Sequence, residues 1–236
     1  MKGANATSPH EWPAPWRVQV VEETGSTNAD LLVAGRSGAP HGTVLVADHQ
    51  TAGRGRLDRT WDAPPAANLL VSLLFRDAGT DPRELTRRVA IAAVHACEAV
   101  AGVRPVLKWP NDLLLDDRKL AGILAQGGPN LEFVVVGLGL NIGWAPEGAA
   151  RLPTGTRDDV LLALLEALGE LPADIGAEYR SLLGTLGELV RVELPNGSFS
   201  GTAVDVDDAG RLVVDTGSER RVVDVGDVIH MRRVAR

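Results

Sequence analysis

One short segment concentrates arginine and glycine in a way that suits an anion. Three arginines, Arg54, Arg56 and Arg59, stand beside two glycines, Gly53 and Gly55. Arginine forks pair with carboxylates and phosphates through two parallel hydrogen bonds, and glycine lets backbone N–H groups approach a ligand closely. The segment therefore predicts an anion-binding loop, and an ordinary solvated surface loop is the alternative.

A lysine ends an apolar, strand-like stretch further along the chain. Lys108 follows Leu107 and precedes Trp109-Pro110, and the fixed φ of Pro110 sets the direction in which the chain leaves the strand. A positive charge held there can neutralise a carboxylate and an α-phosphate together. An edge-strand lysine without such a role is the alternative.

Two further strand-like segments carry glycine at interior positions. Gly122 interrupts an apolar run, and Gly137 and Gly139 alternate in another. A glycine inside a strand indicates close approach by a ligand or by another backbone. We expect a surface without side chains on which a flat ligand can lie. A β-bulge at Gly122 and tight packing at the other two glycines are the alternatives.

Other kinds of site are not indicated. The five histidines lack metal-ligand spacing, so no catalytic zinc is expected. The chain contains neither the phosphate-binding loop G-x-x-x-x-G-K-[ST] nor the esterase pattern G-x-S-x-G. The formal net charge is −7, and an acidic chain is a poor general binder of nucleic acid. Any positive site must therefore be local.

Cysteine usage and hydropathy predict a cytoplasmic protein. Cys97 is the single cysteine, so no internal disulfide can form. Residues 1–15 lack the apolar core of a signal peptide. No apolar run approaches the roughly 20 residues that span a bilayer, so no membrane association is expected.

The elements that must position these residues follow from hydrophobic periodicity. Apolar β-branched runs predict strands, and a polar cap before a periodic apolar run predicts a helix. The predicted strands cover 17–22, 43–48, 68–75, 103–109, a hairpin at 113–126 and a long strand at 131–143, with a loop at 49–67. The predicted helices cover 29–38, 82–101, 157–170 and 173–183.

Composition divides the chain into three predicted parts. Residues 1–15 are rich in Pro, Asn and Ser and predict a flexible tail. Residues 16–184 hold all the candidate site residues in an α+β arrangement, a mixed central sheet with flanking helices. Residues 185–236 contain short strands separated by turns, which is typical of a small β-barrel.

In their order along the chain, these segments resemble the catalytic domain of biotin–protein ligases. The matching pieces are Ser26-Thr27-Asn28, Gly53 to Trp61, Ala67-Asn68-Leu69 with Ser72, Lys108 to Asp112, Lys119 with Gly122-Ile123-Leu124, and Gly137 to Asn141. Asp58 departs from the pattern, because the family usually has glycine there. Asp tolerates unusual turn geometry better than most residues. Its negative charge leads us to expect weaker loop closure or a pair with an arginine.

The resemblance implies a fold and an activity. The fold is the class II synthetase-like catalytic domain shared by lipoate and biotin ligases, followed by an SH3-like barrel at 185–236. The activity has two steps: biotin and ATP, with Mg²⁺, give biotinyl-5′-AMP, and a lysine of a biotin carboxyl carrier domain of a carboxylase then receives the biotin. A homodimer is possible, since relatives dimerise. Only 25 residues precede Ser26, too few for the DNA-binding domain of the bifunctional repressors, so no operator binding is expected.

The resemblance also implies residue roles. Lys108 is implied at the biotin carboxylate and the adenylate, and Arg54 and Arg56 are implied as catalytic residues in a loop that closes over biotin. The implied biotin-binding residues are Ser26, Thr27, Asn28, Gln50, Gly53, Arg54, Gly55, Arg56, Lys108 and Gly122. The implied ATP- and phosphate-binding residues are Arg59, Lys119, Asn111, Asn141 and Trp61. Asn141 is also the implied Mg²⁺ contact. Trp61 and Trp144 are candidates to pack near biotin or adenine, with a structural role as the alternative for each.

Three rival functions remain open on the sequence. A lipoate or octanoyl transferase shares the architecture but lacks the complete arginine loop followed by Lys-Trp-Pro-Asn-Asp. A biotin-responsive regulator without turnover would bind the same ligand. A β-barrel interaction module with an attached α/β domain would leave the arginine loop of an acidic chain unexplained.

Overall fold

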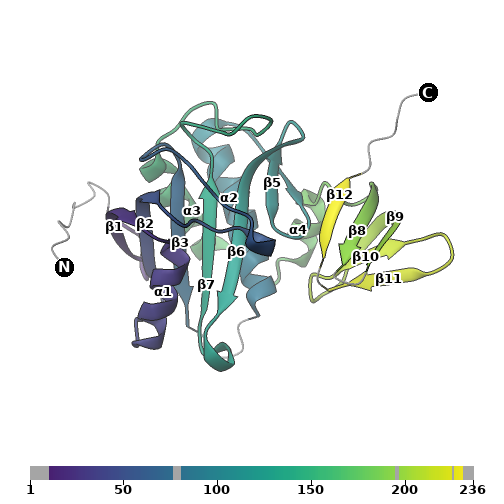
Figure 1. Cartoon of the computed structure of the whole chain (residues 1–236), viewed down its shortest axis with the longest axis horizontal. Coiled ribbons are helices and arrows are strands. Elements are labelled where there is room, and N and C mark those ends of the chain that lie inside the picture. Colours follow the sequence, from purple (N-terminus) through teal and green to yellow (C-terminus); the bar gives the residue numbers. More distant parts are fainter. Residues whose placement is uncertain (1–10, 77–80, 195–196, 225, 231–236) are drawn as a thin grey trace.

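The chain forms two β-sheets of different size that lie side by side (Figure 1). The structure is a computed structural model, and it describes residues 11–76, 81–194, 197–224 and 226–230. The first ten residues of the predicted N-terminal tail lie outside the described residues. The large sheet has seven strands in the order β1-β2-β3-β7-β6-β5-β4, and the small one has five in the order β11-β10-β9-β8-β12.

The large sheet is mixed, as predicted. β1 and β2 run parallel, while the other neighbouring strands pair antiparallel. Its strands are β1 Arg17–Thr24, β2 Thr43–Gln50, β3 Leu69–Phe75, β4 Val106–Lys108, β5 Asp112–Leu115, β6 Arg118–Gly127 and β7 Val134–Leu140. The predicted α+β class is thereby confirmed.

Helices cover both faces of the large sheet (Figure 1). α1 (Thr27–Arg36) packs against one face, and α2 (Pro82–Ala101) and α3 (Arg157–Glu170) lie against the other. Local sequence explains the ends of α2: the Asp81 side chain accepts a hydrogen bond from the Arg83 amide at 2.9 Å, and Gly102 ends the helix at φ 64°. The short helix α4 (Gly176–Leu182) leads into the small sheet.

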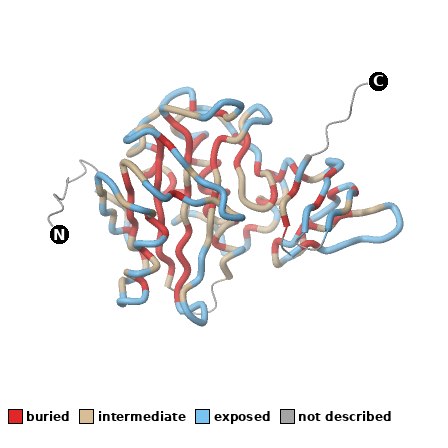
Figure 2. The backbone as a smooth tube through the Cα atoms, in the orientation of Figure 1, coloured by how far each residue is buried: buried red, intermediate tan, exposed pale blue. Residues whose placement is uncertain are grey.

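Apolar side chains fill both layers between sheet and helices. Figure 2 shows nearly continuous buried runs along the central strands. Because successive strand residues point to opposite faces, neighbouring residues of one strand serve different cores. On the α1 side the buried cluster is Leu31, Leu45, Leu74, Phe133 and Val135. The strands are thus held rigidly from both sides, which fixes the residues at their ends.

Three predicted elements are shorter in the structure by four residues or more. The strand predicted at 131–143 is limited to Val134–Leu140, because Asn130 and Leu131 adopt positive φ in a 3-10 turn. The helix predicted at 173–183 begins only at Gly176, where the Asp174 side chain accepts from the Gly176 amide at 2.8 Å. The strand predicted at 103–109 is limited to β4, since Pro105 has no N–H to donate to a ladder.

The small sheet contains β8 Leu189–Leu194, β9 Gly197–Val206, β10 Leu212–Asp215, β11 Arg220–Val223 and β12 Asp227–His230. Within the described residues, its neighbouring strands all pair antiparallel, consistent with the predicted SH3-like domain. This unit is called the C-terminal sheet below.

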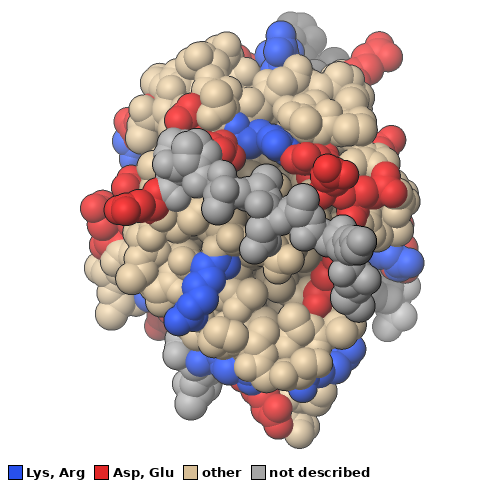
Figure 3. Space-filling model, turned by 90° about the vertical axis from the view of Figure 1, so that its left-hand side faces the viewer, with Lys and Arg blue, Asp and Glu red and all other residues tan. Residues whose placement is uncertain are grey.

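Charge is mixed on the face of the molecule that lies on the β1 side. Figure 3 shows the face on the β1 side, where acidic and basic side chains are interspersed without one extended basic patch. In the described part of the chain, no helix is long and apolar enough to cross a membrane.

Candidate functional site

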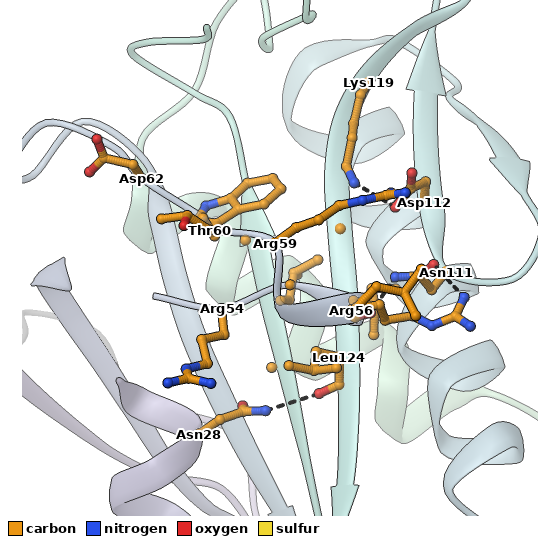
Figure 4. Close-up of a pocket in the computed structure, with 18 of the residues that line it drawn as sticks. Asn28, Arg54, Arg56, Arg59, Thr60, Asp62, Asn111, Asp112, Lys119 and Leu124 are labelled. Carbon is orange, nitrogen blue, oxygen red and sulfur yellow. Dashed lines mark hydrogen bonds and ion pairs between the residues drawn. The ribbon is translucent and has the colours of Figure 1, made fainter. Parts of the chain in front are cut away.

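A cavity of about 260 Å³ opens on the α1 face of the large sheet (Figure 4). Gly137 and Gly139 lie on that face, because they follow Val135 by two and four residues along β7, and Val135 packs against α1. The predicted site residues that line the cavity are Ser26, Thr27, Asn28, Gln50, Arg54, Gly55, Arg56, Arg59, Trp61, Lys108, Asn111, Lys119, Gly122 and Asn141. Gly53 does not line it, and Trp144 lines a separate hollow together with Arg118 and Arg151.

The segment from Gly53 to Trp61, called the arginine loop below, is a narrow hairpin over this cavity. The Trp61 amide donates to the Gly53 carbonyl at 3.0 Å, and the Gly55 amide donates to the Arg59 carbonyl at 2.7 Å. A Cβ on Gly53 would overlap the Trp61 carbonyl oxygen, so only glycine allows this close approach. The glycines therefore shape the hairpin that presents the arginines.

Asp58 occupies a strained position in the arginine loop. Asp58 has φ 55° and Leu57 has φ 54°, in the left-handed region that favours glycine. The Asp58 carboxylate lies 3.4 Å from Nη1 of Arg54, so the expected pair with an arginine is present. Both side chains are largely exposed, and such a pair contributes little stability. Asp58 thus strains the turn and partly neutralises one loop cation.

The other two loop arginines reach across the cavity. Nη1 of Arg56 donates to Oδ1 of Asn111 at 3.3 Å, and Nη2 donates to the Gly226 carbonyl at 3.0 Å. Arg59 forms an ion pair with Asp227. Burial lowers the pKa of the Arg56 guanidinium, and the negative charge of Asp227 opposes that effect. The arginine loop is therefore tied to β12, far away in the sequence.

The two lysines of the cavity differ in their partners. Nζ of Lys119 lies 2.7 Å from Oδ1 of Asp112 and 5.6 Å from the centre of the Trp61 ring. Lys108 is half-buried at the end of β4, and within the described residues its ammonium has no hydrogen bond or ion pair. Lys108 therefore offers an unneutralised charge to a ligand.

The glycine surface of the large sheet is covered by a tryptophan. Gly122 and Gly139 pair across β6 and β7, and a Cβ on Gly139 would overlap the Trp61 indole. The irregular register of β5 and β6 lies between Leu113 and Leu114, so Gly122 itself is not a bulge. Trp61 Nε1 is buried without a hydrogen-bond partner. The sequence led us to expect a flat ligand on this surface. In the described chain the indole ring of Trp61 lies there.

A hydrogen-bonded network closes the end of the cavity near α1. Oε1 of Gln50 accepts from the Thr27 amide at 2.8 Å and from Thr27 Oγ1 at 3.0 Å. The Ser72 hydroxyl lies 2.7 Å from Thr27 Oγ1 and donates to Oδ1 of Asn28 at 2.6 Å. Because Oε1 of Gln50 is occupied, the orientation of its amide is fixed and its NH₂ group remains the available donor. The Ser26 hydroxyl makes no hydrogen bond within the described residues.

Two asparagines predicted as ligand contacts also brace the backbone. Nδ2 of Asn28 donates to the Leu124 carbonyl at 3.1 Å and to Oε1 of Gln126 at 2.8 Å. Asn141 is 2% exposed; its Nδ2 donates to the Ala150 carbonyl at 2.9 Å, and its Oδ1 accepts from Asn68 at 3.1 Å. Their amide groups are thus already engaged, and their predicted ligand contacts stay predictions.

The structure adds polar residues that the sequence analysis did not select. Ser72 lies fully buried at the centre of the network, and Asp112 and Asp227 pair with two cavity cations. Ser72 and Asp112 stood inside matched motifs, so a signal was present for both. Asp227 lies 168 residues from Arg59, in a segment without a motif. Among the described residues no group of three or more His, Cys, Asp or Glu side chains can hold a metal ion.

Comparison with known proteins agrees with this geometry. The model of the biotin/lipoate A/B protein ligase family matches residues 20–141, and that of the biotin protein ligase C-terminal domain matches residues 185–231. The biotin–[acetyl-CoA-carboxylase] ligase of Mycobacterium tuberculosis is 41% identical, over 92% of this chain and 90% of that protein. The bifunctional ligase/repressor BirA of Bacillus subtilis is 29% identical, over 89% of this chain and 71% of the relative.

A solved structure supports the same relationship. The biotin protein ligase of Aquifex aeolicus in complex with biotin and ATP superposes with a TM-score of 0.79 at 25% identity, covering 92% of this chain and 99% of the other. Sequence and fold therefore agree along nearly the whole length of both proteins. The chain belongs to the biotin/lipoate A/B protein ligase family and, within it, to the biotin protein ligases.

Proposed function

We propose that the cavity under the arginine loop is where this biotin protein ligase joins biotin to AMP and then passes biotin to an acceptor lysine. The observation that carries the proposal is the meeting of two distant cationic segments around one cavity. Arg54, Arg56 and Arg59 come from the arginine loop, and Lys108 comes from the end of β4. Relatives that use biotin and ATP share this arrangement of the chain.

The first step must bring two anions together. The biotin carboxylate attacks the α-phosphate of ATP, and pyrophosphate leaves. Lys108 is suited to hold both groups because its ammonium is not already paired, whereas Lys119 is paired with Asp112. A positioned charge in a partly closed site stabilises the developing charge without reorganisation and aligns the reacting atoms. Lys119 and Arg59 are proposed to contact the remaining phosphates.

The polar network near α1 is proposed to hold the ureido ring of biotin. That ring carries N–H donors and a carbonyl acceptor, so it needs both kinds of partner. Ser26 offers a free hydroxyl, and Gln50 offers an NH₂ donor whose orientation is fixed by Thr27. The apolar body of biotin would then extend along the strands toward Lys108.

Mg²⁺ fits the site as a companion of ATP. Mg²⁺ takes oxygen ligands and is usually bound through one or two carboxylates plus substrate phosphates. The Asp112 carboxylate lines the cavity beside Lys119, so it is the proposed protein ligand. Asn141, the metal contact predicted from the sequence, has its amide engaged with Asn68 and Ala150. When bound, Mg²⁺ would shield the triphosphate charge.

The proposed acceptor is the lysine of a biotin carboxyl carrier domain of a cytoplasmic biotin-dependent carboxylase. A relative with 41% identity is named as a ligase for acetyl-CoA carboxylase, which supports this class of partner. The ε-amine of that lysine would attack the mixed anhydride and release AMP. The arginine loop covers the cavity and would keep water from the anhydride until the amine arrives.

The test is labelling of a purified carrier domain by the full chain with biotin and ATP. We expect incorporation of biotin that requires ATP, Mg²⁺ and the acceptor lysine. The same protein is assayed for pyrophosphate exchange with lipoate in place of biotin. Exchange with lipoate alone would identify a lipoate-type enzyme, and biotin binding without labelling would identify a regulator. Absence of both binding and labelling would leave an interaction module, and each of these results would refute the proposal.

A further inference from the structure

The C-terminal sheet contacts the arginine loop at two adjacent residues. The Gly226 carbonyl accepts a hydrogen bond from Nη2 of Arg56 at 3.0 Å, and the Asp227 carboxylate forms an ion pair with Arg59. Asp227 also lines the cavity, and its side chain is 26% exposed. Two of the three loop arginines are therefore held from outside the catalytic domain, at the start of β12.

The start of β12 can act as an anchor only if the C-terminal sheet is fixed to the catalytic domain. Nε1 of Trp109 donates to the Gly210 carbonyl at 2.9 Å, and its backbone amide donates to Thr185 Oγ1 at 2.9 Å. Arg180 adds an ion pair with Asp205 at 3.1 Å. Because Trp109 directly follows Lys108, these contacts fix the sheet relative to the lysine proposed to hold the reacting groups.

The C-terminal sheet contacts the catalytic domain at two separate places. One end of the C-terminal sheet, at Gly210, supports the strand that carries Lys108. The other end, at Gly226 and Asp227, contacts the arginine loop, which lines the same cavity. The C-terminal sheet therefore contacts both cationic segments of the cavity.

We propose that Asp227 is a positioning residue that latches the arginine loop in its closed position through Arg59. The inference rests on the proposed function of that loop as the cover of the activated biotin. Loss of the carboxylate frees Arg59, and among the contacts of the described residues the bond between Arg56 and the Gly226 carbonyl, just before β12, then remains to hold the loop. The expected consequences are more frequent opening of the loop and faster escape of biotinyl-5′-AMP.

The C-terminal sheet provides a matched control. Asp224 forms an ion pair with Arg83 at the start of α2, so it also joins the two domains, but it does not line the cavity. Asp227→Asn and Asp224→Asn each remove one charge from the same part of the sheet. Asp227→Glu retains the carboxylate and tests rescue. If Asp227→Asn does not fold, Arg59→Gln removes the same ion pair by changing its other member.

Opening of the loop is measured by limited trypsin digestion of the full-length variants without biotin, ATP or acceptor. Cleavage is scored after Arg54 in every variant, since Arg59→Gln removes one trypsin site. An ion pair of this exposure is worth at most about 1 kcal/mol, which corresponds to about fivefold. We expect cleavage to be about fivefold faster in Asp227→Asn and in Arg59→Gln. The variant that combines these two changes should be cleaved no faster than either single variant. Asp224→Asn and Asp227→Glu should be cleaved at the wild-type rate.

A second readout follows the intermediate. Release of biotinyl-5′-AMP without acceptor is expected to accelerate by a similar factor in Asp227→Asn and to stay unchanged in Asp224→Asn. Equal behaviour of the Asn variants at 227 and 224 in both measurements would overturn the latch. Failure of wild-type protein to biotinylate a carrier domain would instead refute the proposed function, and the digestion would still report whether Asp227 holds the loop.

Discussion

Removal of the Lys108 charge separates a role in chemistry from a role in folding. Lys108 lines the cavity and has no hydrogen bond or ion pair within the described residues. Lys108→Met keeps most of the apolar stem and deletes the charge. Because none of the described residues loses a partner, we expect the free energy of unfolding to change by no more than about 0.5 kcal/mol.

The expected effect on adenylation is much larger. Two unit charges 4 Å apart interact by about 4 kcal/mol at an effective dielectric constant of about 20. Loss of one preorganised group that stabilises developing charge typically costs about 3–4 kcal/mol, or on the order of 10²–10³-fold in rate. Lys108 is half-buried, so the lower end of that range is the prediction.

The assay is biotin-dependent exchange of radiolabelled pyrophosphate into ATP, with thermal unfolding measured on the same samples. Arg118→Gln is the control, because it removes a cation near the site that does not line the main cavity. We expect kcat/KM to fall by about 100-fold in Lys108→Met and to stay within about twofold in Arg118→Gln. Near-normal exchange in Lys108→Met would refute the reasoning, and so would a large loss of stability.

Further variants test other parts of the site. Arg56→Gly breaks the bonds to Asn111 and Gly226, so it should retain some adenylation but release biotinyl-5′-AMP faster; release no faster than wild type would contradict the loop as a lid. Asp58→Gly relieves a left-handed residue and frees Arg54, so unfolding free energy should rise by about 1 kcal/mol or less and KM for biotin should fall; an unchanged KM for biotin would count against the charge argument. Gly139→Val collides with the Trp61 indole, so stability should drop by about 1–3 kcal/mol with altered tryptophan fluorescence, and an unaltered spectrum would contradict the packing. Burial raises the pKa of the Cys97 thiol to about 12, so iodoacetamide at neutral pH should label it only upon unfolding; rapid labelling of native protein would show that the helix opens locally.

The sequence predicts the regular elements well where local signals and burial agree. α2 begins and ends at the predicted residues, because Asp81 and Gly102 supply a cap and a left-handed stop. The predictions are less accurate where a turn competes with an apolar run. Leu131 looks like a strand residue, but its backbone belongs to the 3-10 turn before β7. Apolar composition alone does not reveal where such a turn ends.

The site is predictable to the extent that it is built from contiguous motifs. The arginine loop and Lys108 could be recognised separately, and the structure brings both to one cavity. The partners of the loop arginines could not be recognised, because Gly226 and Asp227 are ordinary turn and strand residues until the C-terminal sheet docks. Long-range pairing of this kind leaves no periodic signal in the sequence.

The charges around the cavity explain how an acidic protein can bind two anions. Five cationic and three acidic side chains line the cavity, so the local balance is positive although the chain carries a net charge of −7. Asp58, Asp112 and Asp227 each pair with a different cavity cation, which limits repulsion among the cations before any ligand arrives. Among the described cavity cations, Arg56 and Lys108 lack such a carboxylate partner, and Arg56 is held by the neutral groups of Asn111 and Gly226. Anions that enter can therefore meet these two charges without displacing a carboxylate, while contact with Arg59 or Lys119 requires exchange of a carboxylate for a phosphate. This difference predicts that ATP binding depends on ionic strength less steeply than a count of five cations would suggest.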